Sequence, residues 1–242
     1  MARFHAAALH FILNLIVGVG LLSLCWFVWY PAPMLLAIGG HEIFLLIVGI
    51  DVALGPLLTL MVFDVKKRSL KFDIFVIALI QVGAMMYGVN TLLEVRPAYV
   101  AALGDHFQVV LVSELTDANM AKANVTPPLW GPKWVGTQGP RDVYEKDQVA
   151  AMTSFGGGRG HLPQLHVPYA LMVKEILQGS KLIAVLKKDN PQKTAEIDSW
   201  LHKHGYTEQA AKFQPIKISA SEFVVFVDGV TAAVIGIAPF RP

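Results

Sequence analysis

A run of 21 apolar residues, Ile43–Phe63, constrains this 242-residue chain more than any other feature. Asp51 is the only charged side chain within it, and Glu42 and Asp64 bound it on either side. At about 1.5 Å of rise per residue, a helix of this length spans the roughly 30 Å hydrocarbon core of a bilayer. The run therefore predicts a membrane-spanning helix with an acid close to its centre.

Two further apolar segments, Leu9–Tyr30 and Ile74–Leu93, also predict membrane-spanning helices. Leu9–Tyr30 is longer than the roughly 7–15 apolar residues of a signal peptide, and the aromatic residues at its far end are typical of a retained interfacial helix. Only 16% of the residues are charged, against about 25% in soluble domains. The prediction is a membrane domain over residues 1–96, with helices at about 9–30, 43–63 and 74–93.

The basic residues predict how these helices are oriented. Lys66, Lys67, Arg68 and Lys71 crowd the connection between the second and third segments, whereas the connection between the first and second has no Lys or Arg. Loops rich in Lys and Arg stay in the cytoplasm. A basic site for anionic lipid is the alternative interpretation. The first interpretation places the N-terminus in the cytoplasm and everything after Arg96 on the far side.

An acid at the centre of a membrane helix costs on the order of 2.5–3.5 kcal/mol, so Asp51 should face protein or water. Gly55 and Pro56 follow one turn later, and Gln81 lies in the third segment. Small residues let helices approach closely, and amides in lipid seek partners on neighbouring helices. These four residues are therefore candidates for packing within the membrane or for contact with a partner, and the sequence leaves both roles open.

Residues 97–242 predict one α+β domain outside the cytoplasm. Tyr99–Leu103 and Phe107–Ser113 predict one hairpin, and Asp228-Gly229 predicts another between Glu222–Asp228 and Thr231–Ala238. The other expected elements are helices at 115–123, 141–154, 168–179 and 191–204 and a strand at 182–186. The predicted fold class is a membrane protein with three transmembrane α-helices followed by an α+β extracytoplasmic domain.

Two irregular stretches interrupt these elements. Pro127–Gly139 places Trp130 and Trp134 among prolines and glycines, which favours a loop that covers the core over an exposed aromatic surface. Gly156–Gly160 lacks the spacing of a phosphate-binding loop, so we expect a flexible linker there.

No pattern in the chain predicts catalysis, a cofactor or a metal. The eight histidines form no H-E-x-x-H motif, and His161 and His166 have neither cysteines nor a carboxylate cluster near them in sequence, as a zinc site would require. A formal net charge of +2 is too small to indicate a nucleic-acid partner. We therefore expect no catalytic, cofactor-binding or metal-binding residue and predict that the protein is not an enzyme.

Several ordered motifs resemble those of TfpX/TfpZ-type type IV pilin accessory proteins. The resemblance covers about the first 135 residues. The motifs that carry it are FVWYP at Phe27–Pro31, GIDVALGPLLTLMVF at Gly49–Phe63, KKRSLKFD at Lys66–Asp73, RPAYV at Arg96–Val100, DHFQVV at Asp105–Val110 and WGPKWV at Trp130–Val135.

The resemblance implies an inner-membrane protein that assists a cognate type IV major pilin in stability, assembly or extension without catalysing a reaction. Besides the lipid bilayer, the partners it implies are that pilin and other components of the pilus machine. No functional residue is transferred from the family. The alternative hypothesis is a small proton-coupled transporter or sensor, in which Asp51 titrates beside a helix broken at Gly55 and Pro56.

Overall fold

The computed structural model describes residues 2–154, 156–218 and 221–242. The chain divides into two compact units. The helical unit contains the residues up to Pro31 and Gly39–Arg96, and the α+β unit contains Ala32–Ile38 and Pro97–Pro242. Most of the division therefore falls between Arg96 and Pro97, but a short segment with one helical turn, α2 (Met34–Ala37), groups with the second unit.

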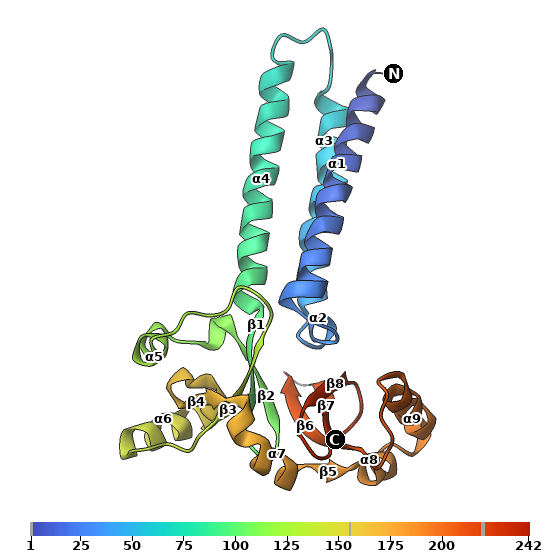
Figure 1. Ribbon diagram of the computed structural model, residues 1–242. Coiled ribbons are helices and arrows are strands. Elements are labelled where there is room, and N and C mark those ends of the chain that lie inside the picture. The colour runs from blue at the N-terminus through green and yellow to red at the C-terminus, as the bar shows by residue number, and fades with distance from the viewer. Residues whose placement is uncertain (1, 155, 219–220) are drawn as a thin grey trace. The chain divides into compact units, whose positions relative to one another are not determined.

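Three long helices make up the helical unit (Figure 1). They are α1 (Ala2–Leu24), which continues into a π-helical turn at Cys25–Trp29, α3 (Gly40–Val62) and α4 (Leu70–Val95). All three are long and apolar enough to cross a membrane. The existence of three such helices, predicted from hydropathy, is confirmed.

All three helices begin earlier in the chain than predicted. The first helix begins at Ala2, seven residues before the predicted start at Leu9. Three consecutive alanines, residues 6–8, favour helix although they are less apolar than the segment that follows. The third helix likewise begins at Leu70 and ends at Val95, beyond both predicted ends. Hydropathy marks the apolar middle of a helix, whereas propensity and hydrogen bonding extend it.

Glycines set the distance between the three helices. A Cβ on Gly18 of α1 would lie 2.7 Å from the Val48 side chain of α3, and one on Gly88 of α4 would lie 2.7 Å from the Ile47 side chain. Helices that meet at such positions approach more closely than bulkier residues permit. The unit is therefore packed through small residues on its inner faces.

One mixed sheet of eight strands forms the centre of the α+β unit in the part of the chain that the structure describes (Figure 1). Its order is β4-β3-β1-β2-β6-β7-β8, and β5 pairs with β6. The strands are β1 (Pro97–Ala102), β2 (Phe107–Leu111), β3 (Lys133–Thr137), β4 (His166–Pro168), β5 (Lys181–Leu182), β6 (Ala211–Ile218), β7 (Ser221–Asp228) and β8 (Val234–Ala238).

Both predicted hairpins are confirmed. β1 pairs antiparallel with β2 across the turn that contains Gly104, and β7 pairs antiparallel with β8. In the second turn the Asp228 carboxylate accepts hydrogen bonds from the main-chain N–H groups of Val230 and Thr231, at 2.9 and 2.7 Å. An aspartate that bonds to the main chain just after itself is a common way to close a turn.

Helices pack beside the sheet in two groups. One group, α5 (Asp117–Ala123) and α6 (Val143–Ser154), lies near β3 and β4, and the other, α8 (Ile183–Asp189) and α9 (Thr194–Lys203), lies near β6–β8 (Figure 1). Between them α7 (Val173–Gly179) follows a 3₁₀ turn. One buried cluster joins the second group of helices to the sheet.

The strand predicted at 182–186 is wrong except at Leu182, which lies in β5. The next residues begin α8 instead, and Ile183 and Leu186, three apart on one helix face, enter the core. A short apolar run fits a buried helix as well as a strand. Asn190, which follows α8, donates its amide N–H groups to the carbonyl groups of Leu186 and Arg241, both at 2.8 Å.

Both irregular stretches are more ordered than predicted. Residues 127–139 contain β3, which pairs parallel with β1. Trp134 packs edge-on against the buried ring of Phe107, with centroids 5.6 Å apart, whereas Trp130 is 76% exposed and does not cover the core. The glycine-rich stretch is not a loose linker, because Gly160 is buried and a Cβ there would lie 3.0 Å from Ala101. Pairing and close packing across the fold impose this order, and neither is visible in local composition.

A buried glutamine ties the parts of the α+β unit together. Gln214 of β6 is fully buried, and its amide N–H groups donate to the carbonyl oxygens of Gly104, at 2.7 Å, and Ile176, at 2.8 Å. These bonds join the β1–β2 turn and α7 to the central strand. A buried amide with two such bonds fixes how these segments meet.

Candidate functional site

A polar cluster joins the three helices of the helical unit. The main-chain carbonyl of Asp51 accepts hydrogen bonds from the Asn14 side chain of α1, at 2.6 Å, and from the Gln81 side chain of α4, at 3.3 Å. Nearby, His10 Nδ1 and Thr59 Oγ1 share a hydrogen bond of 2.6 Å between α1 and α3. Polar groups among apolar helices are stabilised by such partners.

Gly55 provides the space for this cluster. A Cβ on Gly55 would lie 2.2 Å from Gln81 Nε2 and 2.9 Å from Asn14 Nδ2. Pro56 follows inside α3, where its ring removes one main-chain hydrogen bond. The structure thus brings Asp51, Gly55 and Gln81 together, with Pro56 beside them. Their role toward a partner stays a prediction.

Sequence reasoning missed the contribution of the first helix. His10 and Asn14 are four residues apart and so lie on one face of α1, the face that meets α3. Two polar residues at helical spacing in an apolar segment were a signal for this face. The rotation of each helix about its axis, which shows that His10 and Asn14 contact α3, cannot be read from the sequence.

Asp51 itself is 6% exposed. It lines a cavity of about 370 Å³ between α3 and α4, and the other lining residues are Ile43, Leu46, Ile47, Ile50, Ala84, Tyr87, Gly88 and Thr91. The hydrogen bonds from Asn14 and Gln81 go to its main-chain oxygen rather than to its carboxylate.

The predicted basic residues gather where α3 turns into α4. Lys67 Nζ forms an ion pair of 2.5 Å with Asp73, and the Lys66 main-chain N–H donates to the Asp64 carboxylate at 2.9 Å. Lys71 lies in the first turn of α4. Figure 1 shows this connection at the same end of the helical unit as the start of α1.

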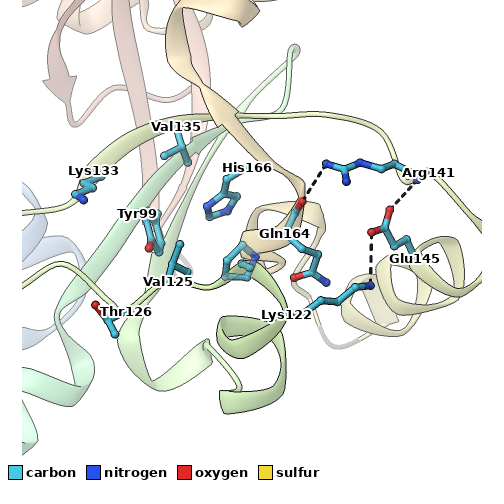
Figure 2. Close-up of a pocket in the computed structure, with 12 residues that line it drawn as sticks. Tyr99, Lys122, Val125, Thr126, Lys133, Val135, Arg141, Glu145, Gln164 and His166 are labelled. Atoms are coloured by element: carbon cyan, nitrogen blue, oxygen red, sulfur yellow. Dashed lines mark hydrogen bonds and ion pairs between the residues drawn. The ribbon is translucent and has the colours of Figure 1, made fainter.

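The α+β unit has a cavity of about 630 Å³ at the β3–β4 side of the sheet (Figure 2). Its walls come from β1, β3, β4, α5, the start of α6 and the turn before β4. The lining residues are Tyr99, Lys122, Ala123, Val125, Thr126, Lys133, Val135, Arg141, Glu145, Pro163, Gln164 and His166.

Three cationic side chains and one carboxylate line this cavity. Lys133 lies at one side, and Lys122, Arg141 and Glu145 lie at the other (Figure 2). The three cations are exposed, whereas Glu145 is only 3% exposed. The accessible part of the cavity is therefore positively charged.

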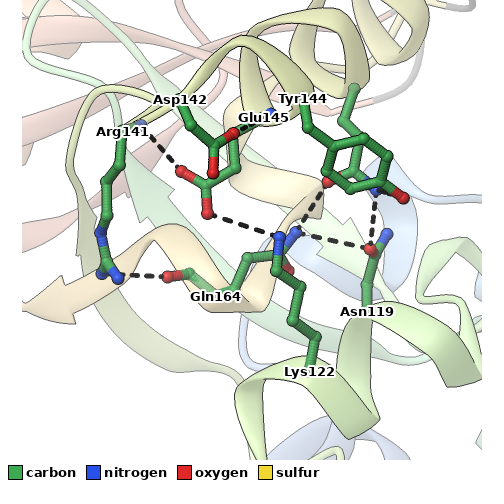
Figure 3. Close-up of polar contacts among 8 residues, drawn as sticks. Asn119, Lys122, Arg141, Asp142, Tyr144, Glu145 and Gln164 are labelled. Atoms are coloured by element: carbon green, nitrogen blue, oxygen red, sulfur yellow. Dashed lines mark hydrogen bonds and ion pairs between the residues drawn. The ribbon is translucent and has the colours of Figure 1, made fainter.

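Glu145 organises the side of the cavity formed by α5 and α6 (Figure 3). Its carboxylate accepts the main-chain N–H of Arg141 at 2.8 Å and lies 3.5 Å from Lys122 Nζ. Its own N–H donates to the Asp142 carboxylate at 2.7 Å, which satisfies one of the free donors at the start of α6. The buried carboxylate thus contacts both cationic residues, Arg141 through its main chain and Lys122 through its side chain.

Amide side chains form the base of this side of the cavity. Gln164 Nε2 lies 3.4 Å from Asn119 Oδ1 and 3.3 Å from Gln148 Oε1 (Figure 3). The Arg141 guanidinium donates to the Gln164 main-chain oxygen at 3.5 Å. Gln164 Oε1 is shielded from solvent and has no hydrogen-bond partner among the described residues.

His166 of β4 is the titratable group in the wall nearest the sheet. Its ring packs edge-on against Tyr99, with centroids 4.7 Å apart, and its Nε2–H donates to the Gly160 carbonyl at 2.8 Å. Burial lowers the pKa of His166 below 6.5, and the charge of His161 lowers it further, although the bond to Gly160 opposes the shift. The ring is therefore neutral at pH 7.

This shift predicts that stability falls as pH drops below about 6.5. The unfolded chain takes up a proton at His166 near pH 6.5 while the folded chain does not, so protonation favours unfolding. We expect urea unfolding of the detergent-solubilised protein, followed by tryptophan fluorescence, to need less urea at pH 5.5 than at pH 7.5. In His166→Gln the difference should shrink, and an undiminished difference would assign the effect to other groups.

A neighbouring histidine, His161, also contacts protein groups through both ring nitrogens. His161 Nε2 lies 3.3 Å from the Glu114 carboxylate, and its Nδ1 accepts the Gly158 N–H at 3.2 Å. His161 and His166 therefore both have protein partners. Within the described residues, no group of three or more His, Cys, Asp and Glu side chains is placed to hold a metal ion.

Comparison with known proteins identifies relatives along most of the chain. The serogroup E1 fimbrial assembly protein of Dichelobacter nodosus is 28% identical over 231 residues, which are 92% of this chain and 89% of that protein. The serogroup I protein is 29% identical over the same shares of both chains. The fimbrial assembly protein of serogroups C1 and C2 is 36% identical over 119 residues, which are 46% of this chain and 91% of that protein.

No family model matches the chain, and no solved structure matches it. The similarity to two of these Dichelobacter nodosus proteins nevertheless extends through both units, since 92% of the chain is aligned with each of them. On this similarity, the chain belongs to the family of the fimbrial assembly proteins.

Proposed function

We propose that this protein is an accessory protein of type IV pilus assembly in the inner membrane, of the TfpX/TfpZ type. It acts without catalysing a reaction and binds the cognate major pilin, aiding its stability or its incorporation into the pilus. Similarity over 92% of the chain to proteins named for fimbrial assembly is the observation that carries this proposal.

Three helices that are long enough to span a bilayer support the location in a membrane. The proposed orientation has the basic stretch Lys66–Lys71 and the N-terminus in the cytoplasm, in agreement with their position at one end of the helical unit (Figure 1). Three crossings then place the α+β unit in the periplasm.

The division into a helical unit and an α+β unit matches a partner that also has a membrane helix and a soluble domain. A pilin awaiting assembly is held in the membrane by one apolar helix, with a soluble head outside. A protein with a helical unit in the membrane and a folded unit outside it can bind both parts. Two linked contacts raise the effective concentration, so neither contact has to be tight.

Co-purification tests this proposal. The tagged full-length protein is isolated in mild detergent from membranes of its own host, and the major pilin is quantified by mass spectrometry. We expect pilin to be enriched at least tenfold over a tagged, unrelated protein with three membrane helices. The absence of pilin enrichment, together with normal pilus number after deletion of the gene, would contradict the proposal.

The burial of Asp51 keeps a proton-coupled transporter or sensor as the second candidate. The variant Asp51→Asn separates the two. In the accessory protein it should preserve pilus number and pilin co-purification within twofold, because Asn14 and Gln81 bond to the main-chain oxygen of residue 51. A protein level equal to wild type combined with lost function would favour a titrating carboxylate instead.

A further inference from the structure

We propose that the 630 Å³ cavity of the α+β unit binds an extended acidic peptide segment of a protein partner. Lys133 and Arg141 attract its carboxylates. The inference rests on the proposed function only for the identity of the partner, which is then the pilin. The binding itself depends on the cavity alone.

The cavity has more positive than negative side chains, which favours an anionic ligand. Glu145 is buried and already contacts Lys122 at 3.5 Å, so these two charges offset each other. The positive charges of Lys133 and Arg141 remain. Within the described residues neither forms an ion pair with a carboxylate. Charge complementarity therefore selects a ligand with at least two negative groups, one for each side of the cavity (Figure 2).

The separation of the two cations favours an extended peptide over a simple anion. Lys133 and Arg141 lie on different sides of the cavity (Figure 2). A single small ion can sit beside one of them, whereas an extended chain with two acidic side chains can reach both.

The walls and the volume agree with this ligand. Tyr99, Val125 and Val135 provide apolar surface for the methylene groups of acidic side chains. Near the cations, the exposed ring of Tyr144 lies 5.1 Å from Lys122 Nζ. A volume of about 630 Å³ is in the range of roughly 300–1,000 Å³ that holds ligands larger than one side chain.

A peptide-binding measurement tests the inference on the full-length protein in detergent. The probe is a fluorescein-labelled pentapeptide of alternating alanine and glutamate with blocked ends, and its counterpart has glutamine in place of glutamate. Fluorescence polarisation is measured at low salt. We expect saturable binding of the glutamate peptide only, weakening as salt is raised.

Variants locate the binding. Lys133→Gln and Arg141→Gln should each weaken it about fivefold, and the double variant about 25-fold. The Arg141 main-chain N–H still donates to Glu145 in these variants, so the wall stays formed. Lys188→Gln with Lys203→Gln removes two exposed lysines of α8 and α9 and should change the affinity less than twofold.

Three results would overturn the inference: no saturable binding of the glutamate peptide, equal binding of both peptides, or equal affinity in the double variant. Vesicles of phosphatidylglycerol that bind through Lys133 and Arg141 while the peptide does not bind would assign the cavity to a lipid headgroup. If pilin co-purifies but the peptide does not bind, only this inference fails. If the peptide binds but pilin does not co-purify, only the proposed function fails.

Discussion

Leucine in place of Gly55 is expected to separate α3 from α1 and α4. Even a Cβ at this position would lie 2.2 Å from Gln81 Nε2 and 2.9 Å from Asn14 Nδ2, so the larger side chain must displace both amides from the Asp51 carbonyl. Overpacking of this kind costs about 1–3 kcal/mol and occasionally more. We expect less protein in membranes and a lower midpoint of thermal unfolding in detergent.

Gly49→Leu is the matched control in the same helix. Gly49 is exposed, and a Cβ there meets nothing within 4 Å. Its protein level and unfolding midpoint should stay near those of wild type. If both variants lose equal amounts of protein and stability, any large side chain in α3 is destabilising. The close packing of Gly55 against Asn14 and Gln81 would then not be the cause of the loss.

Valine in place of Gly179 should have a comparable effect on the α+β unit. Gly179 ends α7 against the β1–β2 turn, where a Cβ would lie 2.2 Å from the Gly104 carbonyl oxygen and 2.8 Å from the Asp105 Cα. These are main-chain atoms, which cannot move aside as a flexible side chain can. The turn must shift, which also breaks the bond from Gln214 to Gly104. We expect a loss of about 3 kcal/mol or more in urea unfolding.

Gly139→Val is the control for this variant, because a Cβ at Gly139 meets nothing within 4 Å. It should unfold within about 0.5 kcal/mol of wild type. A stable Gly179→Val protein with unchanged hydrogen exchange at residues 103–106 would contradict the close approach of α7 to the turn.

The long helices could be predicted because hydropathy acts over 20 or more residues. Single substitutions do not obscure such a signal. The hairpin at Asp228 could also be predicted, because a short turn joins two strands that are adjacent in sequence. The hydrophobic effect and local turn chemistry are both encoded along the chain.

The missed elements depend on contacts between distant residues. β6 contains Gln214 and Pro215, which weaken a strand pattern, yet Gln214 is buried because Gly104 and Ile176 supply its partners. The apolar segment at 182–186 is compatible with a strand or with a helix. From Ile183 onward it forms the start of α8 because its side chains pack against the sheet there. No local property distinguishes these cases.

The two candidate sites differ in how far they were predictable. Asp51, Gly55 and Gln81 stand out as exceptions in apolar segments, so the residues could be chosen before their contacts were known. Lys133 and Arg141 are ordinary surface residues in sequence. They line one cavity because β3 pairs with β1 and the start of α6 lies beside the turn that precedes β4.

Site-specific photocrosslinking to the major pilin tests most directly whether both units bind it. A photoreactive amino acid is placed in living cells at Leu46, on the α3–α4 cavity, or at Val125, on the cavity of the α+β unit. We expect a pilin adduct from each position, with the Val125 adduct reduced in the Lys133→Gln/Arg141→Gln background. Reproducible absence of a pilin adduct from both positions, while a known pilin contact crosslinks in the same cells, would contradict binding of pilin by the two units.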